Sequence, residues 1–194
     1  MLSRMSRRRL WIVTAACAAT VSAALLSGLG LVAEADAPRH APASSRPPNI
    51  VIAVADDWSW PHAGIEGDPV VRTPTFDRLA GEGVRFTHAF VAAPSCTPSR
   101  AAILTGQAPH RLAEGAQLWS HLPARFAVYP DLLEARGYTV GHMGKGWGPG
   151  EFEPGGRTRN PAGPKFANLA EFLGKRPAGA PFAFWFGSTA PHRP

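Results

Sequence analysis

The sequence has few of the residues that would indicate a disulfide-stabilised or a nucleic-acid-binding protein. It contains only two cysteines, Cys17 and Cys96, in 194 residues. The formal net charge is +6, but four of the 20 basic residues and one of the 14 acidic residues lie in the first 35 residues, which leaves 16 and 13. No run of lysines and arginines interleaved with aromatic residues follows. A nucleic-acid partner is therefore disfavoured, whereas a mild positive balance suits an anionic substrate.

Residues 1–35 are typical of a signal peptide for export. Three consecutive arginines at 7–9 precede an apolar stretch over 11–32, and small-residue cleavage sites follow near Ala35 or Ala37. The arginines also resemble a twin-arginine signal, which implies export of the folded protein by dedicated machinery. An uncleaved membrane anchor is the alternative, because the apolar stretch is nearly long enough to span a bilayer.

Cys96 is the single cysteine outside the predicted signal peptide, so no internal disulfide forms once that segment is removed. It is followed by Thr-Pro-Ser-Arg and an apolar stretch that ends at Gly106. Pro98 is compatible with the first turn of a helix, where the N–H groups have no helical partner. An anion beside Cys96 would meet those N–H groups, the positive end of the helix and Arg100. A packing thiol and an intermolecular disulfide are alternatives, but the polar flanks favour a functional cysteine.

Two adjacent carboxylates follow the first predicted strand. The apolar, β-branched run over 49–55 predicts a strand buried on both faces of a parallel sheet, and Asp56 and Asp57 come next. Ligands of open α/β sheets bind beyond the carboxyl ends of the strands. A cation would relieve the repulsion within the pair, and oxygen ligands suit Ca²⁺ or Mg²⁺. Solvated turn residues are the alternative.

Two basic side chains follow later predicted strands. Lys145 comes after a strand over 138–143, and His192 comes after one over 181–188. Both are therefore expected in the same crevice as the carboxylates. The glycines around Lys145 do not form a phosphate loop, because no Ser or Thr follows the lysine and no glycine lies at the required distance before Gly144.

The succession of strands and helices predicts an α/β fold in which helices sandwich a mainly parallel sheet. Residues 36–48, rich in Ala, Pro and Ser, indicate a linker, and the domain is expected over 49–194. The other predicted elements are a strand over 84–91 and helices over 73–82, 129–136 and 166–173.

Five segments, taken in order, resemble the type I sulfatases of the alkaline phosphatase superfamily. The segments are Asn49 to Asp57, Thr73 to Ala80 with Gly83 to Phe86, Cys96 to Arg100 with Leu104 to Gly106, Gly144-Lys145, and Pro191-His192. The Cys-x-Pro-Ser-Arg pattern is the specific one. The resemblance implies a truncated N-terminal part of the family's catalytic domain, without the later metal ligands. The Pro-His-Arg-Pro end is loosely similar to glycosaminoglycan sulfatases, including heparan N-sulfatases.

The resemblance implies hydrolysis of sulfate esters or sulfamates on a sulfated small molecule or glycan. A formylglycine-generating enzyme would oxidise Cys96 to formylglycine, whose hydrate would attack sulfur. Arg100 would hold the formylglycine, while Lys145 and His192 would contact the sulfate oxygens. The catalytic residues implied are Cys96, Arg100, Lys145 and His192. The Ca²⁺ ligands implied are Asp56, Asp57 and the residue at position 96.

One departure from the family pattern follows Lys145. Many sulfatases have a histidine shortly after the Gly-Lys pair, whereas Gly146, Trp147 and Gly148 stand here. That role is empty or is filled by another group, such as His142. A phosphate or phosphonate ester hydrolase of the same superfamily is the alternative enzyme, since some of these also use formylglycine. A secreted carbohydrate-binding or catalytically inactive module is the non-enzyme alternative.

Overall fold

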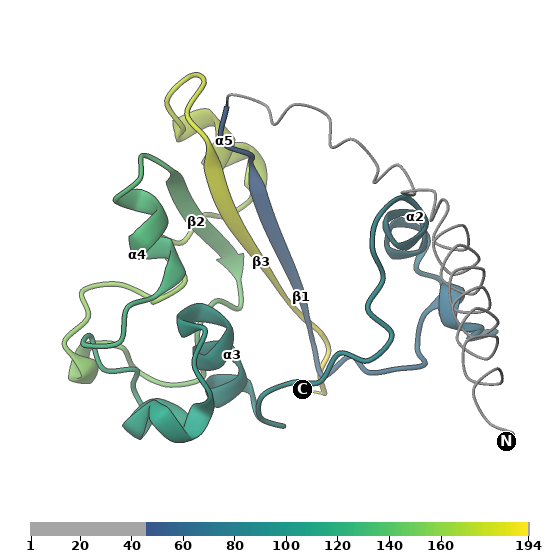
Figure 1. The fold of residues 1–194 in the computed structure, drawn as a ribbon, viewed down its shortest axis with the longest axis horizontal. Coiled ribbons are helices and arrows are strands. Elements are labelled where there is room, and N and C mark those ends of the chain that lie inside the picture. The colour runs from purple at the N-terminus through teal and green to yellow at the C-terminus, as the bar shows by residue number, and fades with distance from the viewer. Residues whose placement is uncertain (1–45, 194) are drawn as a thin grey trace, which may run out of the picture. The chain divides into compact units, whose positions relative to one another are not determined.

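The computed structural model describes residues 46–193, so the predicted signal peptide and most of the predicted linker lie outside the described residues. The strands are β1 (Ile50–Asp56), β2 (Thr139–Gly144) and β3 (Phe182–Pro191). They form one parallel sheet in the order β1-β3-β2 (Figure 1). The last strand in sequence therefore lies between the first two. In the register, Ala183 of β3 stands opposite both Ile50 and Val140.

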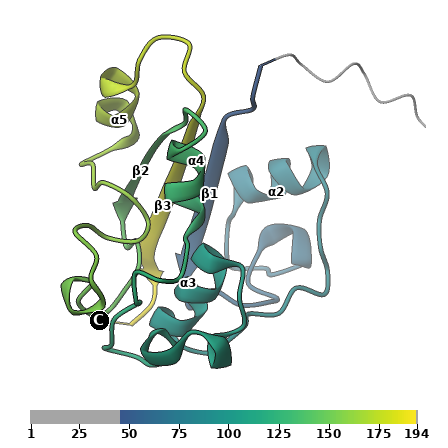
Figure 2. The same cartoon turned by 60° about the vertical axis from the view of Figure 1, so that its left-hand side comes forward.

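Helices cover both faces of this sheet (Figures 1 and 2). The helices are α2 (Pro74–Glu82), α3 (Cys96–Thr105), α4 (Tyr129–Glu134) and α5 (Leu169–Lys175). On one face, α3 and the segment that enters α4 pack against Trp185 of β3. On the other face, Phe172 of α5 lies with its ring centroid 4.7 Å from that of Phe184. The predicted α/β sandwich is confirmed. None of the helices within 46–193 is both long and apolar enough to cross a membrane.

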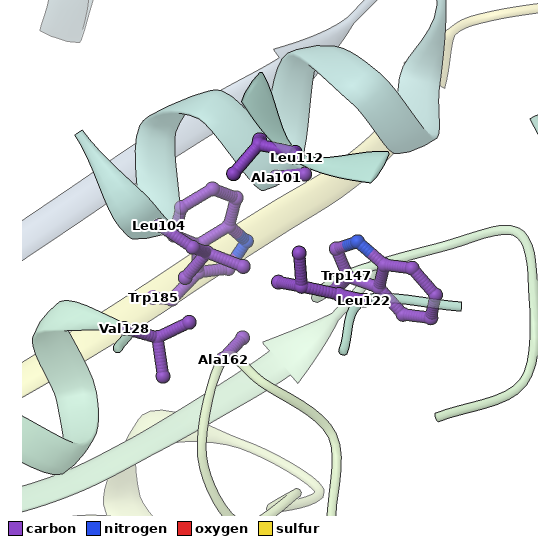
Figure 3. Close-up of a cluster of buried hydrophobic side chains, with 8 residues drawn as sticks. All are labelled: Ala101, Leu104, Leu112, Leu122, Val128, Trp147, Ala162 and Trp185. Atoms are coloured by element: carbon purple, nitrogen blue, oxygen red, sulfur yellow. The ribbon is translucent and has the colours of Figure 1, made fainter. Parts of the chain in front are cut away.

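The core lies between α3 and the sheet (Figure 3). Ala101 and Leu104 project from α3 toward the fully buried indole of Trp185. The small side chain of Ala101 lets the helix lie close to the sheet, and Leu122 and Val128 close the cluster from the following segments. The packing fixes the depth at which the N-terminus of α3 meets the ends of the strands.

Most of the predicted elements are confirmed, with ends shifted by a few residues, but the predicted strand over 84–91 is wrong. That segment has no regular structure, and its apolar side chains are exposed; Phe90, for example, is 89% exposed. A strand depends on hydrogen bonds to a neighbouring strand, and in residues 46–193 no strand pairs with this segment. Its β-branched and aromatic composition is therefore insufficient to form a strand here.

The expectation that the first strand is buried on both faces is also wrong. Ile52 and Val54 pack against the core, but Val51, on the opposite face, is 58% exposed. The reason is the position of β1 at an edge of the described sheet. The aromatic contacts of α5 reach Phe182 and Phe184 of the central strand, and Val51 lies one strand further out.

Candidate active site

Cys96 is the first residue of α3, as the sequence predicts. Ser95 precedes the helix with extended backbone (φ −152°). The first turn closes with a hydrogen bond of 3.0 Å from the amide of Ser99 to the carbonyl of Ser95. The amides of Cys96 and Thr97 therefore have no partner within the helix, and the thiol stands at the positive end of the helix dipole.

The carboxylate of Asp56 connects the charged groups of the site. It ends β1, is 5% exposed, and accepts hydrogen bonds from the ammonium of Lys145 and from Nη2 of Arg100, the latter at 3.3 Å. The Sγ of Cys96 lies 3.8 Å from this carboxylate and 3.3 Å from the Lys145 ammonium. The structure thus brings together four residues that the sequence places on three separate segments.

The charge state of Asp56 follows from two opposing effects. Burial acts to raise its pKa, but the hydrogen bond and charge of Lys145, together with the charge of Arg100, outweigh burial and hold the pKa below its ordinary value. Asp56 is therefore a carboxylate at neutral pH, and it keeps Lys145 beside the thiol.

Arg100 is buried behind the cysteine and joins three segments. Its Nη1 donates to the carbonyls of Lys145 at 2.7 Å and Gly146 at 2.9 Å, while its Nη2 donates to Asp56. The guanidinium carbon also lies 5.8 Å from the ring centroid of Trp185. These contacts fix α3 to the end of β1 and to the loop after β2. The contact of Arg100 with a modified Cys96 side chain stays a prediction.

The backbone after β2 sets the direction of the Lys145 side chain. Gly144 has a left-handed conformation (φ +68°), and a Cβ at this position would lie 2.1 Å from the carbonyl oxygen of Gly187. Glycine is therefore required where the chain leaves the sheet. The carbonyl of Lys145 then points inward, where it also accepts the indole N–H of Trp185 at 3.0 Å, and the side chain reaches Asp56.

His192 and Asp57 lie at the same end of the sheet. The Nε2 of His192 is 3.6 Å from the carboxylate of Asp57. One ligand atom each from Asp56, Cys96 and His192 lie within 4.8 Å of one another. This set contains His192 and not Asp57, whose side chain is 65% exposed and reaches the site through His192. The chemical roles of these side chains stay predictions.

The donor set fits a hard cation in part. Asp56 and Asp57 supply carboxylate oxygens from one strand end, and such oxygens are the ligands that Ca²⁺ and Mg²⁺ prefer. Ca²⁺ takes six to eight oxygens, so these two residues account for part of a coordination shell. Conversion of Cys96 to an oxygen-bearing side chain would replace its soft sulfur with a further ligand of the preferred kind.

Comparison with known proteins identifies the family. Residues 48–151, more than half of the chain, match the family model described as Sulfatase. The chain belongs to the sulfatase family. It is 40% identical over 144 residues, or 68% of the chain, to N-acetylgalactosamine-6-sulfatase of Mus musculus. It is 44% identical over 121 residues, or 58% of the chain, to arylsulfatase A of Homo sapiens. The matches cover 26% and 24% of these relatives, so the chain spans about a quarter of their length.

A solved structure supports the same fold for this sulfatase chain. The structure of BT4656 in complex with its substrate, D-glucosamine-2-N,6-O-disulfate, superposes with a TM-score of 0.59 at 25% identity. The match covers 75% of this chain and 35% of that one. The parallel sheet with helices on both faces is thus the alkaline phosphatase-like fold of a sulfatase, and the predicted family and fold class are confirmed.

The sulfatase site opens into a cleft of about 870 Å³, within the range typical of small-molecule sites. Its charged lining residues are Lys145, Arg159 and Lys165, and no acidic side chain of the described residues lines it. Cys96 and His192 line the same cleft. Its electrostatics therefore favour an anionic ligand.

Two residues that line the cleft bear on the missing histidine after Lys145, the position where the sequence departs from the family pattern. Trp147, two residues after Lys145, is buried in the core cluster, so this position contributes packing. His142 is buried, and its Nδ1 lies 2.9 Å from the carbonyl of Gly163, which assigns the ring proton to Nδ1. Burial lowers the pKa of His142, so the neutral imidazole predominates at neutral pH.

Sequence reasoning missed Trp119, Arg159 and Lys165, which also line the cleft. They belong to irregular segments, for which periodicity predicts no side-chain direction. The density of glycine and proline around 144–165 is the one signal that points to a cleft-forming loop, and it does not distinguish individual side chains.

Proposed function

We propose that this chain is part of an exported sulfatase that hydrolyses sulfate esters or sulfamates on a sulfated carbohydrate, with position 96 as the nucleophile. One observation carries the proposal: the Cys96 thiol lies beside the Asp56–Lys145 ion pair, 3.3 Å from the ammonium, in a cleft that has basic but no acidic lining residues among those described. Two similar proteins, N-acetylgalactosamine-6-sulfatase and BT4656 in complex with its disulfated glucosamine substrate, support a sugar substrate.

The chemistry follows from converting Cys96 to formylglycine, which a formylglycine-generating enzyme would do. The aldehyde adds water to give a geminal diol. One hydroxyl loses its proton and attacks sulfur, and the sugar alcohol of an ester, or the sugar amine of a sulfamate, leaves with a proton. The second hydroxyl then loses its proton as the carbon–oxygen bond to sulfate breaks, which restores the aldehyde. One water is consumed for each sulfate released.

The chain's own residues have distinct parts in this scheme. Lys145, whose ammonium is 3.3 Å from Sγ, is placed to stabilise the negative charge that develops on the sulfate oxygens. Asp56 holds that ammonium in position. His192 approaches from the end of β3, within reach of the same oxygens. Arg100 positions the Lys145 loop through its two carbonyl contacts.

Asp56, Asp57 and the residue at position 96 would hold Ca²⁺, or Mg²⁺ in its place. The ion would supply positive charge that polarises the sulfate and favours ionisation of the attacking hydroxyl. We also propose that the protein is exported through its N-terminal segment, with cleavage near Ala35 or Ala37; both positions lie outside the described residues.

Peptide mass spectrometry of the protein from its own host tests the nucleophile. The peptide that contains Cys96 is expected to weigh about 18 Da less than its unmodified form, the difference between a thiol and an aldehyde side chain. An intact, alkylatable thiol would contradict the proposal.

Turnover by the complete protein tests the reaction. A fluorogenic sulfate ester should be hydrolysed, and Cys96→Ala should abolish that hydrolysis. Thr87→Ala, at an exposed position outside the cleft lining, is the control and should retain it. Faster turnover of the corresponding phosphonate ester than of the sulfate ester would assign the site to the phosphonate hydrolases instead.

A further inference from the structure

We propose that Trp119 and Lys165 form a second recognition subsite of the cleft, which binds a sugar ring carrying a sulfate group other than the one being hydrolysed. The inference rests on the proposed function, because Cys96 and the two subsite residues line the same cleft. The ligand class is an oligosaccharide with at least two sulfate groups. The Trp119 indole would stack on a sugar ring, and the Lys165 ammonium would pair with the additional sulfate.

Trp119 has an unusual position for a large apolar side chain. It is 76% exposed, lines the cleft, and has a left-handed backbone (φ +58°). Such a conformation is uncommon for a bulky residue and concentrates at functional sites. An exposed indole presents a flat apolar face with a hydrogen-bond donor at its edge, and this combination matches the C–H face and the hydroxyls of a sugar ring.

The backbone next to Trp119 is fixed by contacts of Ser120. Ser120 forms a parallel bridge with Gly150, and a Cβ on Gly150 would lie 2.2 Å from the carbonyl oxygen of Ser120. The Ser120 hydroxyl lies 2.7 Å from the carbonyl of Gln117 and also within hydrogen-bond distance of that of Glu114, and its single proton is shared between them. The backbone that carries the indole is therefore fixed next to Trp119, so binding a ligand costs little ordering of this segment.

Lys165 is the cation of the cleft that has no carboxylate partner among the described residues. Lys145 is paired with Asp56, and Arg159 is bonded to carboxylates of α4. The side chain of Lys165 is exposed. Its backbone is fixed along β2, because the amide of Phe166 donates to the carbonyl of His142 at 2.8 Å. A cation on a fixed backbone and without an acid partner among the described residues, in a cleft without acidic lining residues, is a site for an anion.

The size of the cleft accommodates a second sugar ring. Its volume of about 870 Å³ lies in the upper part of the range for small-molecule sites. The reacting groups occupy the part where Cys96, Lys145 and His192 converge. Trp119 and Lys165 line the same cleft and make none of the contacts that join these groups, so the subsite would select the substrate and would take no part in the reaction itself.

Calorimetric titration of the complete protein carrying Cys96→Ala tests the subsite without turnover. The probes are a disulfated disaccharide and the same disaccharide with a single sulfate. Adding Trp119→Ala should weaken binding of both probes about tenfold, whereas Trp119→Phe should retain most of the affinity. Adding Lys165→Ala should weaken the disulfated probe about fivefold and change the monosulfated probe by less than about twofold.

Two control variants match these changes outside the cleft. Trp60 is 77% exposed, and Lys175 lies on the outer face of α5; neither lines the cleft. Trp60→Ala and Lys175→Ala should leave both affinities unchanged. Equal affinities of the Trp119→Ala variant and its parent would overturn the subsite. So would equal losses for both probes in Lys165→Ala, or no binding of either probe to the parent.

Turnover separates the subsite from the proposed function. The Cys96-containing protein is assayed with the fluorogenic sulfate ester. The expected binding pattern without turnover would contradict the proposed function and leave the subsite standing. Turnover together with probe affinities that do not change in Trp119→Ala and Lys165→Ala would overturn the subsite and leave the proposed function standing.

Discussion

Replacing Arg100 by methionine removes a buried cation that donates hydrogen bonds to three oxygens. These oxygens are the backbone carbonyls of Lys145 and Gly146 and the carboxylate of Asp56. Arg100 is 3% exposed, and methionine fills much of its volume without its charge. Asp56 would lose one of its two cationic partners but keep Lys145. The carbonyl of Lys145 would keep the indole N–H of Trp185, whereas that of Gly146 would lose the guanidinium donor.

The expected cost follows from these separate losses. Removing one partner of a buried ion pair costs about 3 to 5 kcal/mol, and the low end applies because Asp56 keeps one cation. A buried carbonyl left without a donor costs about 1 to 3 kcal/mol on its own. Since the two terms share one side chain, we expect a combined loss of about 3 to 4 kcal/mol. Arg100→Lys should lose about half of this, because one ammonium reaches fewer of the three oxygens.

Urea unfolding of the complete protein, followed by far-UV circular dichroism, measures the loss as a lower midpoint at unchanged slope. Lys175→Met is the matched control, because it removes a cation from the exposed pair with Glu171, and its loss should be much smaller. A loss of unfolding free energy under about 1 kcal/mol for Arg100→Met would refute the stabilising role assigned to the buried Arg100 guanidinium.

The effect of Arg100→Met should also depend on pH. The folded-state pKa of Asp56 is lowered, so its contribution to stability is present above its ordinary pKa of 3.8 and is lost as pH falls through the folded value. Arg100 is one cause of that lowering. The difference in stability between the variant and the unchanged protein should therefore narrow below about pH 4. A constant difference across this range would mean that the loss has no electrostatic component.

Two further substitutions test the backbone and the buried imidazole. Gly144→Ala should destabilise by about 3 kcal/mol or more, because its Cβ would meet the carbonyl oxygen of Gly187; Gly174→Ala in α5, where a Cβ meets nothing within 4 Å, should not destabilise, and calorimetric unfolding compares the two. Burial lowers the folded-state pKa of His142, so the stability present above about pH 6.5 is lost as pH falls through the lowered value. His142→Gln should flatten this acid-side loss in unfolding midpoints measured between pH 7 and 5; an unchanged slope would contradict the assignment.

Local sequence patterns predict the elements whose formation depends on local causes. The helix after Ser95 was predictable because Pro98 suits its first turn and Gly106 ends it in a left-handed conformation. The three strands were predictable because their apolar runs are short and followed by polar residues. The segment over 84–91 has the same composition, yet it is not a strand here. Strand formation requires a partner, and composition does not specify one.

The convergence of Asp56, Cys96 and Lys145 was predictable for a topological reason. Parallel strands end at the same edge of the sheet, so residues that follow them meet. The contacts themselves were not predictable. The Asp56–Lys145 pair joins residues 89 positions apart, and its formation depends on the left-handed turn at Gly144. Trp119 was missed because it lies in an irregular segment next to the Ser120–Gly150 bridge, a contact between residues 30 positions apart that no local pattern reveals.

The strand order β1-β3-β2 also has a consequence for the time at which the site assembles. Asp56 ends β1 and Lys145 follows β2, but each of these strands pairs with β3. A nascent chain that has left the ribosome as far as Gly150 contains both side chains and lacks the strand that sets them side by side. The ion pair therefore forms only after β3 is synthesised and inserted between its neighbours, a long-range step that is slow compared with local helix formation. The ion pair beside Cys96 thus marks the assembly of this three-stranded sheet.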